Sequence, residues 1–288
     1  MIFVLAILFG GLEDNMYYND FYSPYFPIMD TYESLKKRIK DFEDAHNYNI
    51  NAQIIEYRKY GFKDNKEFRE NYIGKVFSSN TSGLFKVIEY LNYDKILVEF
   101  INSGYRVFSR ANNIKKGELK DPYYPSVLGK GYLGLGPFGT NNSIFDNMVY
   151  SRWRELMRRV YQYNEGKSMD TEWHNYQHFS AWMRSEFYLV PGAKLNDMCI
   201  DKDILIPGNM KYGPGRCLIL PDEINNRIQI KDYRKDRIRR VTELNEYELN
   251  RLEYQKSYRE KIVHEMAEKY KWVIPYHVYC ALRDYKMY

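Results

Sequence analysis

The sequence predicts an α+β protein in which helices at both ends of the chain flank a run of short strands. Apolar residues recur at helical spacing in residues 30–48, 143–163 and 241–270. Residues 71–114 instead contain four short runs rich in Val, Ile, Phe and Tyr, separated by turn-forming residues. Because 288 residues suffice for more than one packing unit, we expect four parts, at 1–71, 72–120, 121–226 and 227–288.

The N-terminal part, 1–71, is expected to be a helical extension rich in tyrosine. Leu35, Ile39 and Phe42 have helical spacing and follow a capping residue, Asp30 or Thr31. The apolar start, 1–9, is far shorter than the roughly 20 residues of a membrane-spanning helix, and it lacks the basic lead of a signal peptide. We interpret it as a buried strand or helix, with a short secretion signal as the alternative, and expect no membrane association.

Residues 72–120 are predicted to form a small β module. Its strands fall within 71–79, 84–92, 95–104 and 105–114, and the Asn, Gly and Asp residues between them favour tight turns. Three or four such strands form either an open meander or a small barrel. Pro122 and Pro125 then make a stiff boundary.

A glycine-rich segment follows, in which Gly129, Gly131 and Gly134 have the G-x-G-x-x-G spacing of a dinucleotide-binding loop. That function requires a buried strand before the loop and a helix directly after it. Here a proline-containing loop precedes the glycines and "PFGTNN" follows them. We therefore interpret this segment as a flexible or tightly turned connector.

Two helices are expected in the third part of the chain. In the second of them His174 and His178 have the i, i+4 spacing of the zinc-protease helix, but Asn175 stands where that helix has its glutamate base. We interpret these two histidines as residues that flank the apolar stripe of a core helix. The alternative is that they form a zinc site that a cysteine completes. The first helix, about 143–163, has an apolar stripe formed by Trp153, Leu156, Met157 and Val160.

The stretch 201–226 has the order strand, loop, return strand and helix with which compact nucleases hold one divalent cation. Asp201 takes the place of the metal-binding carboxylate at the end of the first strand, and Asp203 is a second acid. Asn225 offers a third ligand from the helix, and Asn209 lies in the loop, where the residue that orients the base is expected. Carboxylate and amide oxygens are the ligands that suit Mg²⁺ or Mn²⁺.

Lys202 occupies the position of the catalytic base in this layout. A lysine acts as a base only when its pKa falls by several units, whereas adjacent carboxylates raise that pKa. We therefore expect Lys202 to contact phosphate instead. A plain hairpin is the alternative for the whole stretch, because Gly208-Asn209 and Pro214-Gly215 are common turn dipeptides.

Two basic segments flank this stretch, although the net charge of +5 permits a nucleic-acid partner without requiring one. Such residues contact phosphates and fix the register of a protein on DNA without reading its sequence. A solvated charged face is the alternative. The candidate DNA-binding residues are Arg152, Arg158, Arg159, Arg234, Lys235, Arg237, Arg239 and Arg240.

Many spaced positions between 153 and 225 resemble a group of bacteriophage proteins, the HNH-type homing endonucleases that carry a plant ethylene-response-factor-like DNA-binding domain. The resemblance extends over roughly 72–288, through the β module and the C-terminal helices. The matching residues are Trp153, Met157, Glu172, Trp173, Tyr176, Phe179 and Trp182, and in the hairpin Asp201, Lys202, Asp203, Gly208, Asn209, Tyr212, Pro214, Cys217, Pro221, Ile224 and Asn225.

The resemblance implies an HNH-like hairpin-and-helix core at 121–226, DNA as partner and a role for Asp201, Lys202, Asp203 and Asn209 in metal-dependent cleavage. The sequence departs from the family in two respects. The hairpin has no histidine, and the basic run 227–240 stands where the three-stranded DNA-binding domain is expected. Activity as an endonuclease or nickase is therefore open.

The leading hypothesis is a phage DNA-binding protein descended from homing endonucleases, located in the cytoplasm of a bacterial host. The three cysteines form no pairing framework, and their odd number is typical of reduced thiols. The competing hypothesis is a non-catalytic interaction or structural protein on the same fold, with a protein partner bound by the Tyr-rich N-terminal extension.

Overall fold

The computed structural model describes residues 30–60, 66–163, 166–187, 190, 192–228 and 246–285. The apolar start, nearly half of the Tyr-rich extension (1–29 and 61–65) and the basic run 234–240 lie outside the described residues. The described part confirms the α+β prediction: a long N-terminal helix, an antiparallel sheet, two small sheets and C-terminal helices. Among the described residues, no helix is both long and apolar enough to cross a membrane.

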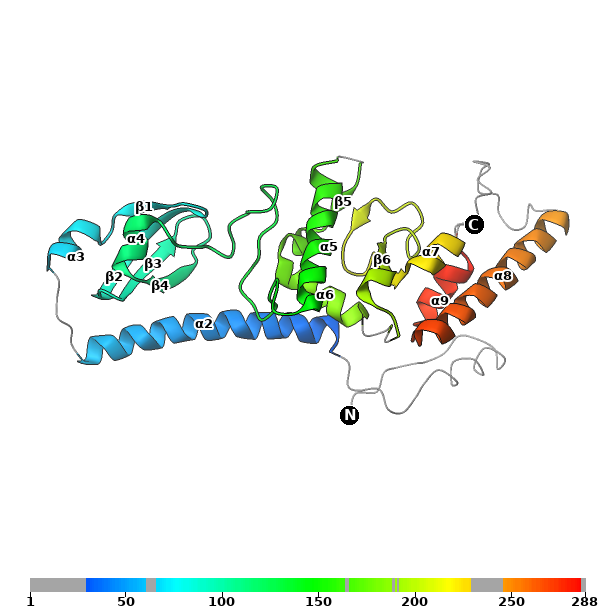
Figure 1. The fold of residues 1–288 in the computed structure, drawn as a ribbon, viewed down its shortest axis with the longest axis horizontal. Helices are drawn as coiled ribbons and strands as arrows, with labels where there is room; N and C mark the ends of the chain where they lie inside the picture. The colour runs from blue at the N-terminus through cyan, green and yellow to red at the C-terminus, as the bar shows by residue number, and fades with distance from the viewer. Residues whose placement is uncertain are drawn as a thin grey trace.

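Helix α2 (Tyr32–Tyr60) is one continuous element and is followed by the short α3 (Lys66–Tyr72). Thr31 is the cap, because its Oγ1 accepts a hydrogen bond from Ser34 N at 3.1 Å. Leu35 and Ile39 are buried as expected, whereas Phe42 is 44% exposed. With 29 residues, the helix is about 43 Å long, and it runs from α6 to the sheet (Figure 1).

The sheet is an open meander of four antiparallel strands in chain order, β1 (Val76–Ser79), β2 (Gly83–Asn92), β3 (Lys95–Phe100) and β4 (Arg106–Ser109). The predicted meander is confirmed, but the alternative of a closed barrel is wrong, since β1 and β4 form opposite edges. Helix α4 (Ala111–Lys116) covers the apolar face of the sheet, so the sheet does not have to close into a barrel to bury that face. Its Ala111 and Ile114 bury the apolar face of the sheet, including Phe85 and Val98.

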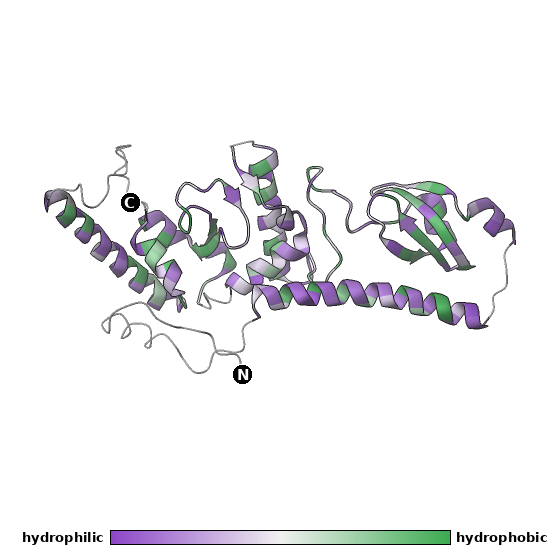
Figure 2. Ribbon diagram, turned by 180° about the vertical axis from the view of Figure 1, so that it is seen from behind, coloured by the Kyte–Doolittle hydropathy of each residue, from purple (hydrophilic) through white to green (hydrophobic). Residues whose placement is uncertain are grey.

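Helix α2 contacts the β module mainly through polar groups, and most of its surface is hydrophilic (Figure 2). His46 Nε2 lies 2.9 Å from Arg106 O, and Lys95 Nζ donates to Gln53 Oε1 at 3.0 Å. Near the other end of the helix, Leu35 and Ile39 pack with Ala181 of α6. The helix thus bridges two separate cores.

The larger core begins with α5 (Ile144–Tyr161), the short β5 (Ser168–Met169), the turn η1 (Thr171–His174) and α6 (Tyr176–Phe187). Ser143 caps α5 by accepting a hydrogen bond from Asp146 N at 3.0 Å. Both predicted helices are confirmed, although a 3₁₀ turn precedes the second. The buried stripe of α5 consists of Val149, Trp153, Leu156, Met157 and Val160.

The glycine-rich connector is tightly turned and packed against these two helices. Val127 and Gly131 form an antiparallel bridge, and Tyr132 N donates to His174 O at 2.9 Å. A Cβ atom on Gly131 would lie 2.9 Å from the Trp153 ring, and one on Gly134 would lie 2.0 Å from Asn175 Oδ1. The glycines therefore allow close approach of backbone to side chains.

The chain continues through η2 (Leu195–Asp197), β6 (Met198–Asp201), β7 (Lys211–Tyr212), β8 (Leu218–Pro221) and α7 (Asp222–Ile228). Strand β7 pairs in parallel with β5, and β6 pairs antiparallel with β8. Helices α8 (Glu246–Tyr270) and α9 (Tyr276–Arg283) follow. Ile262, Val263 and Met266 of α8 are buried in the larger core.

Candidate functional site

The hairpin-and-helix unit predicted at 201–226 has the expected order of elements. Asp201 closes β6 and is paired with Leu218 of β8, and Met198 is paired with Pro221. Helix α7 begins at Asp222, the residue directly after β8. A strand, a loop that contains the short β7, a return strand and a helix therefore follow in this order, with an acidic residue where the first strand ends.

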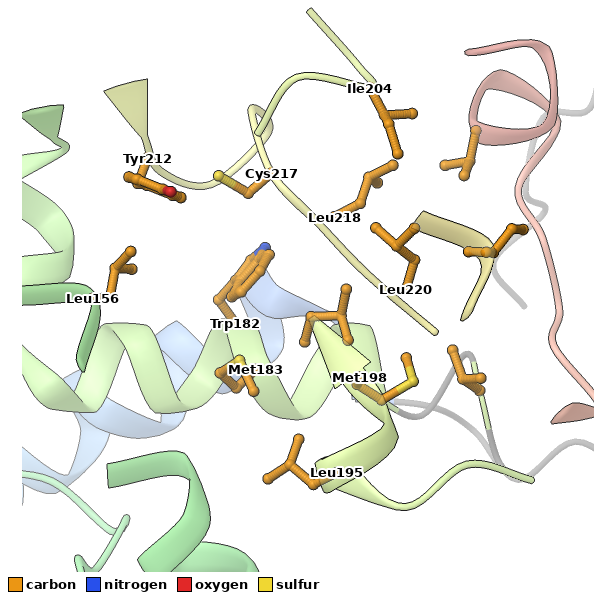
Figure 3. Close-up of a cluster of buried hydrophobic side chains, with 14 of the residues drawn as sticks. Leu156, Trp182, Met183, Leu195, Met198, Ile204, Tyr212, Cys217, Leu218 and Leu220 are labelled. Atoms are coloured by element: carbon orange, nitrogen blue, oxygen red, sulfur yellow. The ribbon is translucent and has the colours of Figure 1, made fainter. Parts of the chain in front are cut away.

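The two strands of the hairpin pack against buried apolar side chains of α6. Trp182 and Met183 of α6 lie beside β6 and β8 in one cluster with Met198, Leu218 and Leu220 (Figure 3). All five side chains are at most 5% exposed. The position of the loop between the strands is therefore set by packing as well as by its own hydrogen bonds.

Asp201 closes a turn at the start of this loop. Its Oδ1 accepts hydrogen bonds from Asp203 N and Ile204 N, both at 2.8 Å. Burial raises the pKa of the Asp201 carboxyl above its usual range, although these two bonds act in the opposite direction. One carboxylate oxygen of the predicted metal ligand is thus used to hold backbone.

Lys202 and Asp203 form an ion pair inside the hairpin. Lys202 Nζ lies 2.7 Å from Asp203 Oδ1, and the lysine side chain is only 9% exposed while that of Asp203 is 32% exposed. An ammonium group at hydrogen-bond distance neutralises the carboxylate that was predicted to bind a cation. It also holds the lysine away from solvent, where we expected it to meet phosphate.

Asn209 stabilises the far end of the loop. Its Nδ2 donates to Lys202 O at 3.0 Å and to Lys211 O at 2.8 Å, and its Oδ1 accepts from Lys211 N at 2.9 Å. The side-chain amide is therefore fully engaged with backbone. Asn209 therefore stabilises the conformation of the loop, and the loop contains no histidine that Asn209 could orient.

Asn225 lies on α7 and is half-buried. Its neighbour Glu223 is engaged elsewhere, with Lys269 Nζ at 2.5 Å and Arg227 Nη1 at 3.7 Å from its carboxylate. Within the described ranges, no group of three or more His, Cys, Asp and Glu side chains is arranged to hold a metal ion. The combination of Asp201, Asp203 and Asn225 stays a prediction.

The described basic candidates lie on α5 and differ in their environment. Arg152 is half-buried, and its Nη2 donates to Leu195 O at 3.2 Å. Arg158 and Arg159 are exposed and share the Glu155 carboxylate, each at 3.6 Å. Arg154 is also exposed and lies 5.8 Å from the Tyr150 ring. Two of the three predicted residues therefore reach solvent.

His174 and His178 take different partners, so the structure does not bring them together as a zinc pair. His178 Nδ1 lies 3.2 Å from Glu172 Oε1, which also accepts from Tyr32 Oη at 2.9 Å. His174 Nε2 instead lies 2.5 Å from Tyr161 Oη on α5. The interpretation as residues that flank the core is supported.

The contact between Tyr161 and His174 was missed by sequence reasoning. The residues are 13 positions apart, on α5 and in the η1 turn, and no motif signals their pairing. Burial lowers the pKa of His174, and the charge of Lys130 acts in the same direction.

Comparisons of the chain with protein-family models, with curated proteins and with solved structures found no match.

Proposed function

We propose that the protein binds duplex DNA, and that it is a bacteriophage protein descended from HNH-type homing endonucleases. The observation that supports this best is the hairpin-and-helix unit, in which β6, a long loop that contains β7, the return strand β8 and α7 follow in this order. In this proposal the unit acts mainly as a scaffold. It fixes the position of α5 relative to the C-terminal helices through the buried cluster around Trp182.

Contacts to DNA would come from the exposed cations of α5. Arg154 and Arg158 are four residues apart, so they lie on one face of the helix and point to the same side. Both are exposed, and the chain is net positive. Guanidinium groups in such an arrangement bind phosphate oxygens and release counterions from DNA.

Metal-dependent cleavage with Mg²⁺ or Mn²⁺ is the further part of the proposal that the hairpin supports least. Oδ1 of Asp201 holds two backbone N–H groups, and Asp203 is neutralised by the buried ammonium of Lys202. A cation at Asp203 would have to displace that ammonium and leave it buried without its partner, which costs several kcal/mol. These residues in this arrangement do not fit a divalent cation, and we assign no catalytic step to them.

A second candidate function, protein binding without DNA, is favoured by one feature of α8. Tyr247 and Tyr254 are 76% and 72% exposed, and Tyr258 is 41% exposed. Their spacing of seven and four residues places them on one face of the helix. Exposed tyrosines on a single face are typical of protein interfaces.

Salt dependence separates these two functions. The affinity of the protein for a fluorescently labelled duplex should fall steeply between about 50 and 200 mM salt if several phosphates are contacted. The Arg154→Ala/Arg158→Ala variant should bind more weakly and with a smaller salt slope, whereas Lys37→Ala, an exposed charge on α2, should not. No affinity of the wild type at low salt would overturn DNA binding.

Cleavage is tested on supercoiled DNA with magnesium, manganese or chelator. We expect no nicking by the wild type. Metal-dependent nicking by the wild type and not by Asp201→Asn would show that the hairpin is an active nuclease centre. Asp201→Asn is the suitable variant because its amide oxygen can still accept the two backbone hydrogen bonds.

A further inference from the structure

A cluster of three polar side chains lies where the connector, α5 and η1 meet. Tyr161 Oη and His174 Nε2 are 2.5 Å apart, and both residues are half-buried, so each still reaches solvent. Lys130 of the connector is exposed and lies two residues before Tyr132, whose backbone N donates to His174 O at 2.9 Å, and its charge lowers the pKa of His174. Within the described ranges no carboxylate forms an ion pair with Lys130. A cation, an imidazole and a phenol therefore share one patch of surface.

The backbone holds this cluster rigidly. Val127 and Gly131 exchange hydrogen bonds of 2.8 and 2.9 Å, and Leu128 has a left-handed φ of 51° that is strained for a leucine. One residue further on, Tyr132 N donates to His174 O at 2.9 Å. The tip of the connector is thereby anchored to the same turn that bears His174. Lys130 is presented on a fixed loop, which reduces the entropy lost on binding.

The same face of α5 continues the positive charge. Arg154, Arg158 and Tyr161 follow at spacings of four and three residues, so they lie along one side of the helix. Ligands of phosphate in proteins are cations, hydroxyl groups and imidazoles that can donate hydrogen bonds. The cluster has one of each.

We propose that Lys130, Tyr161 and His174 form a binding site for one phosphate of a nucleic-acid backbone, at the end of the α5 face that bears Arg154 and Arg158. This inference rests on the proposed DNA binding and names the part of the surface that receives the strand. In the free protein the Tyr161 hydroxyl and the His174 imidazole form a hydrogen bond with each other. When a phosphate binds, the imidazolium and the phenol each donate a hydrogen bond to it, and Lys130 supplies charge.

Binding is then coupled to uptake of a proton by His174. The groups that face the imidazole are Lys130 from the connector, Tyr161 from α5 and Asp170 from the start of its own turn, whose carboxylate is also 3.3 Å from Lys211 Nζ. Burial and Lys130 lower the pKa of His174, while Asp170 raises it. A bound phosphate adds negative charge and raises that pKa. Affinity should therefore increase as the pH falls through the pKa of His174 in the complex.

The test measures the affinity for a labelled duplex as a function of salt and pH, with the full chain. Lys130→Ala should weaken binding about 3- to 10-fold at low salt and reduce the salt slope by about one. Lys120→Ala, an exposed lysine of the same connecting region, is the matched control and should leave both unchanged. His174→Gln should remove the increase in affinity between about pH 7 and pH 5.5.

The failure of this inference differs from the failure of the proposed function. If the wild type binds DNA but Lys130→Ala and His174→Gln bind equally well at every salt and pH, the site is wrong and DNA binding stands. If the wild type does not bind DNA, the His174 imidazole resonance is followed by NMR during titration with inorganic pyrophosphate. A shift would indicate a site for free phosphate, and no shift would leave no phosphate site; either result overturns the assignment to nucleic acid.

Discussion

Lys202 Nζ lies 2.7 Å from Asp203 Oδ1, and this pair joins two adjacent residues at the entrance of the hairpin loop. Lys202 as a whole residue is 8% exposed, so its ammonium group has little contact with water and is stabilised by the carboxylate of Asp203. Neighbouring side chains of an extended strand point to opposite faces, whereas the turn that Asp201 closes brings these two together. The contact therefore depends on the loop conformation.

The first prediction concerns this ion pair. Asp203→Asn should lower the free energy of unfolding by about 1–3 kcal/mol, because it leaves the buried ammonium without a charged partner. Lys202→Met/Asp203→Asn should recover most of the loss, since the buried ammonium is then removed together with its partner. Urea unfolding of both variants measures the difference. Equal stability of the single and double variants would show that the lysine is solvated despite its position.

The second prediction separates the charge of Asp201 from its hydrogen bonds. Asp201→Ala removes the acceptor of two backbone N–H groups and should cost about 1–2 kcal/mol of unfolding free energy. Asp201→Asn keeps an acceptor and should be close to the wild type, and at neutral pH slightly more stable, because burial raises the pKa of Asp201. Thermal unfolding of the two variants provides the comparison. Equal stabilities of the alanine and asparagine variants would show that these two hydrogen bonds contribute little to the stability of the turn.

The third prediction is a pH dependence from Glu186 on α6. Burial raises the pKa of Glu186 to about 7, well above its value in an unfolded chain. At a pH between the unfolded and the folded pKa, the folded state holds a proton on Glu186 that the unfolded state has released. The stability that comes from the protonated, uncharged carboxyl is therefore present at low pH and is lost as the pH rises through about 7. Glu186→Gln should therefore be more stable than the wild type at pH 8, by roughly 2 kcal/mol, and similar to it at pH 5.

Urea unfolding at pH 5, 6, 7 and 8 follows that difference, with Glu118→Gln as the control because Glu118 is exposed. The control should differ from the wild type by a constant amount at every pH. A constant difference for Glu186→Gln as well would mean that the carboxyl of Glu186 is hydrated and titrates normally.

The fourth prediction compares two glycines of the connector that both have a left-handed φ. Gly134 has a φ of 71° and Gly129 a φ of 66°, but only Gly134 is crowded, since an added Cβ would meet Asn175 Oδ1 at 2.0 Å. Gly129→Ala should cost about 1 kcal/mol from the left-handed conformation alone. Gly134→Ala adds a clash and should cost about 2–4 kcal/mol. Equal losses in chemical denaturation would indicate that Asn175 moves aside freely.

Local patterns identified most of the elements correctly. The short runs rich in Val, Ile, Phe and Tyr, with turn-forming residues between them, located the four strands of the meander, and the stripe around Trp153 located α5. The turn residues of 201–226 predicted a hairpin followed by a helix, and both are present as β6, β8 and α7. These signals are short in range, because each depends on the conformation of a few consecutive residues.

The partners of the polar side chains could not be read in the same way. Asp201, Lys202, Asp203 and Asn209 have the residue types of a catalytic hairpin, yet all four hold the loop backbone or one another. Whether a carboxylate faces solvent or a backbone N–H depends on loop torsions and on the packing beneath the loop. The pairing of Tyr161 with His174 likewise arises only when the connector and α5 pack together.

The sequence by itself determined the α+β class, the order of strands and helices along the chain, and the hairpin-and-helix unit, because periodicity and turn chemistry act locally. Only the tertiary structure decided that the sheet stays open, that α2 is a single bridge between two cores and that the hairpin acids are engaged internally. These features depend on contacts between residues far apart in the chain. The free energy of burial is gained when such residues meet, and no local pattern specifies which of them will do so.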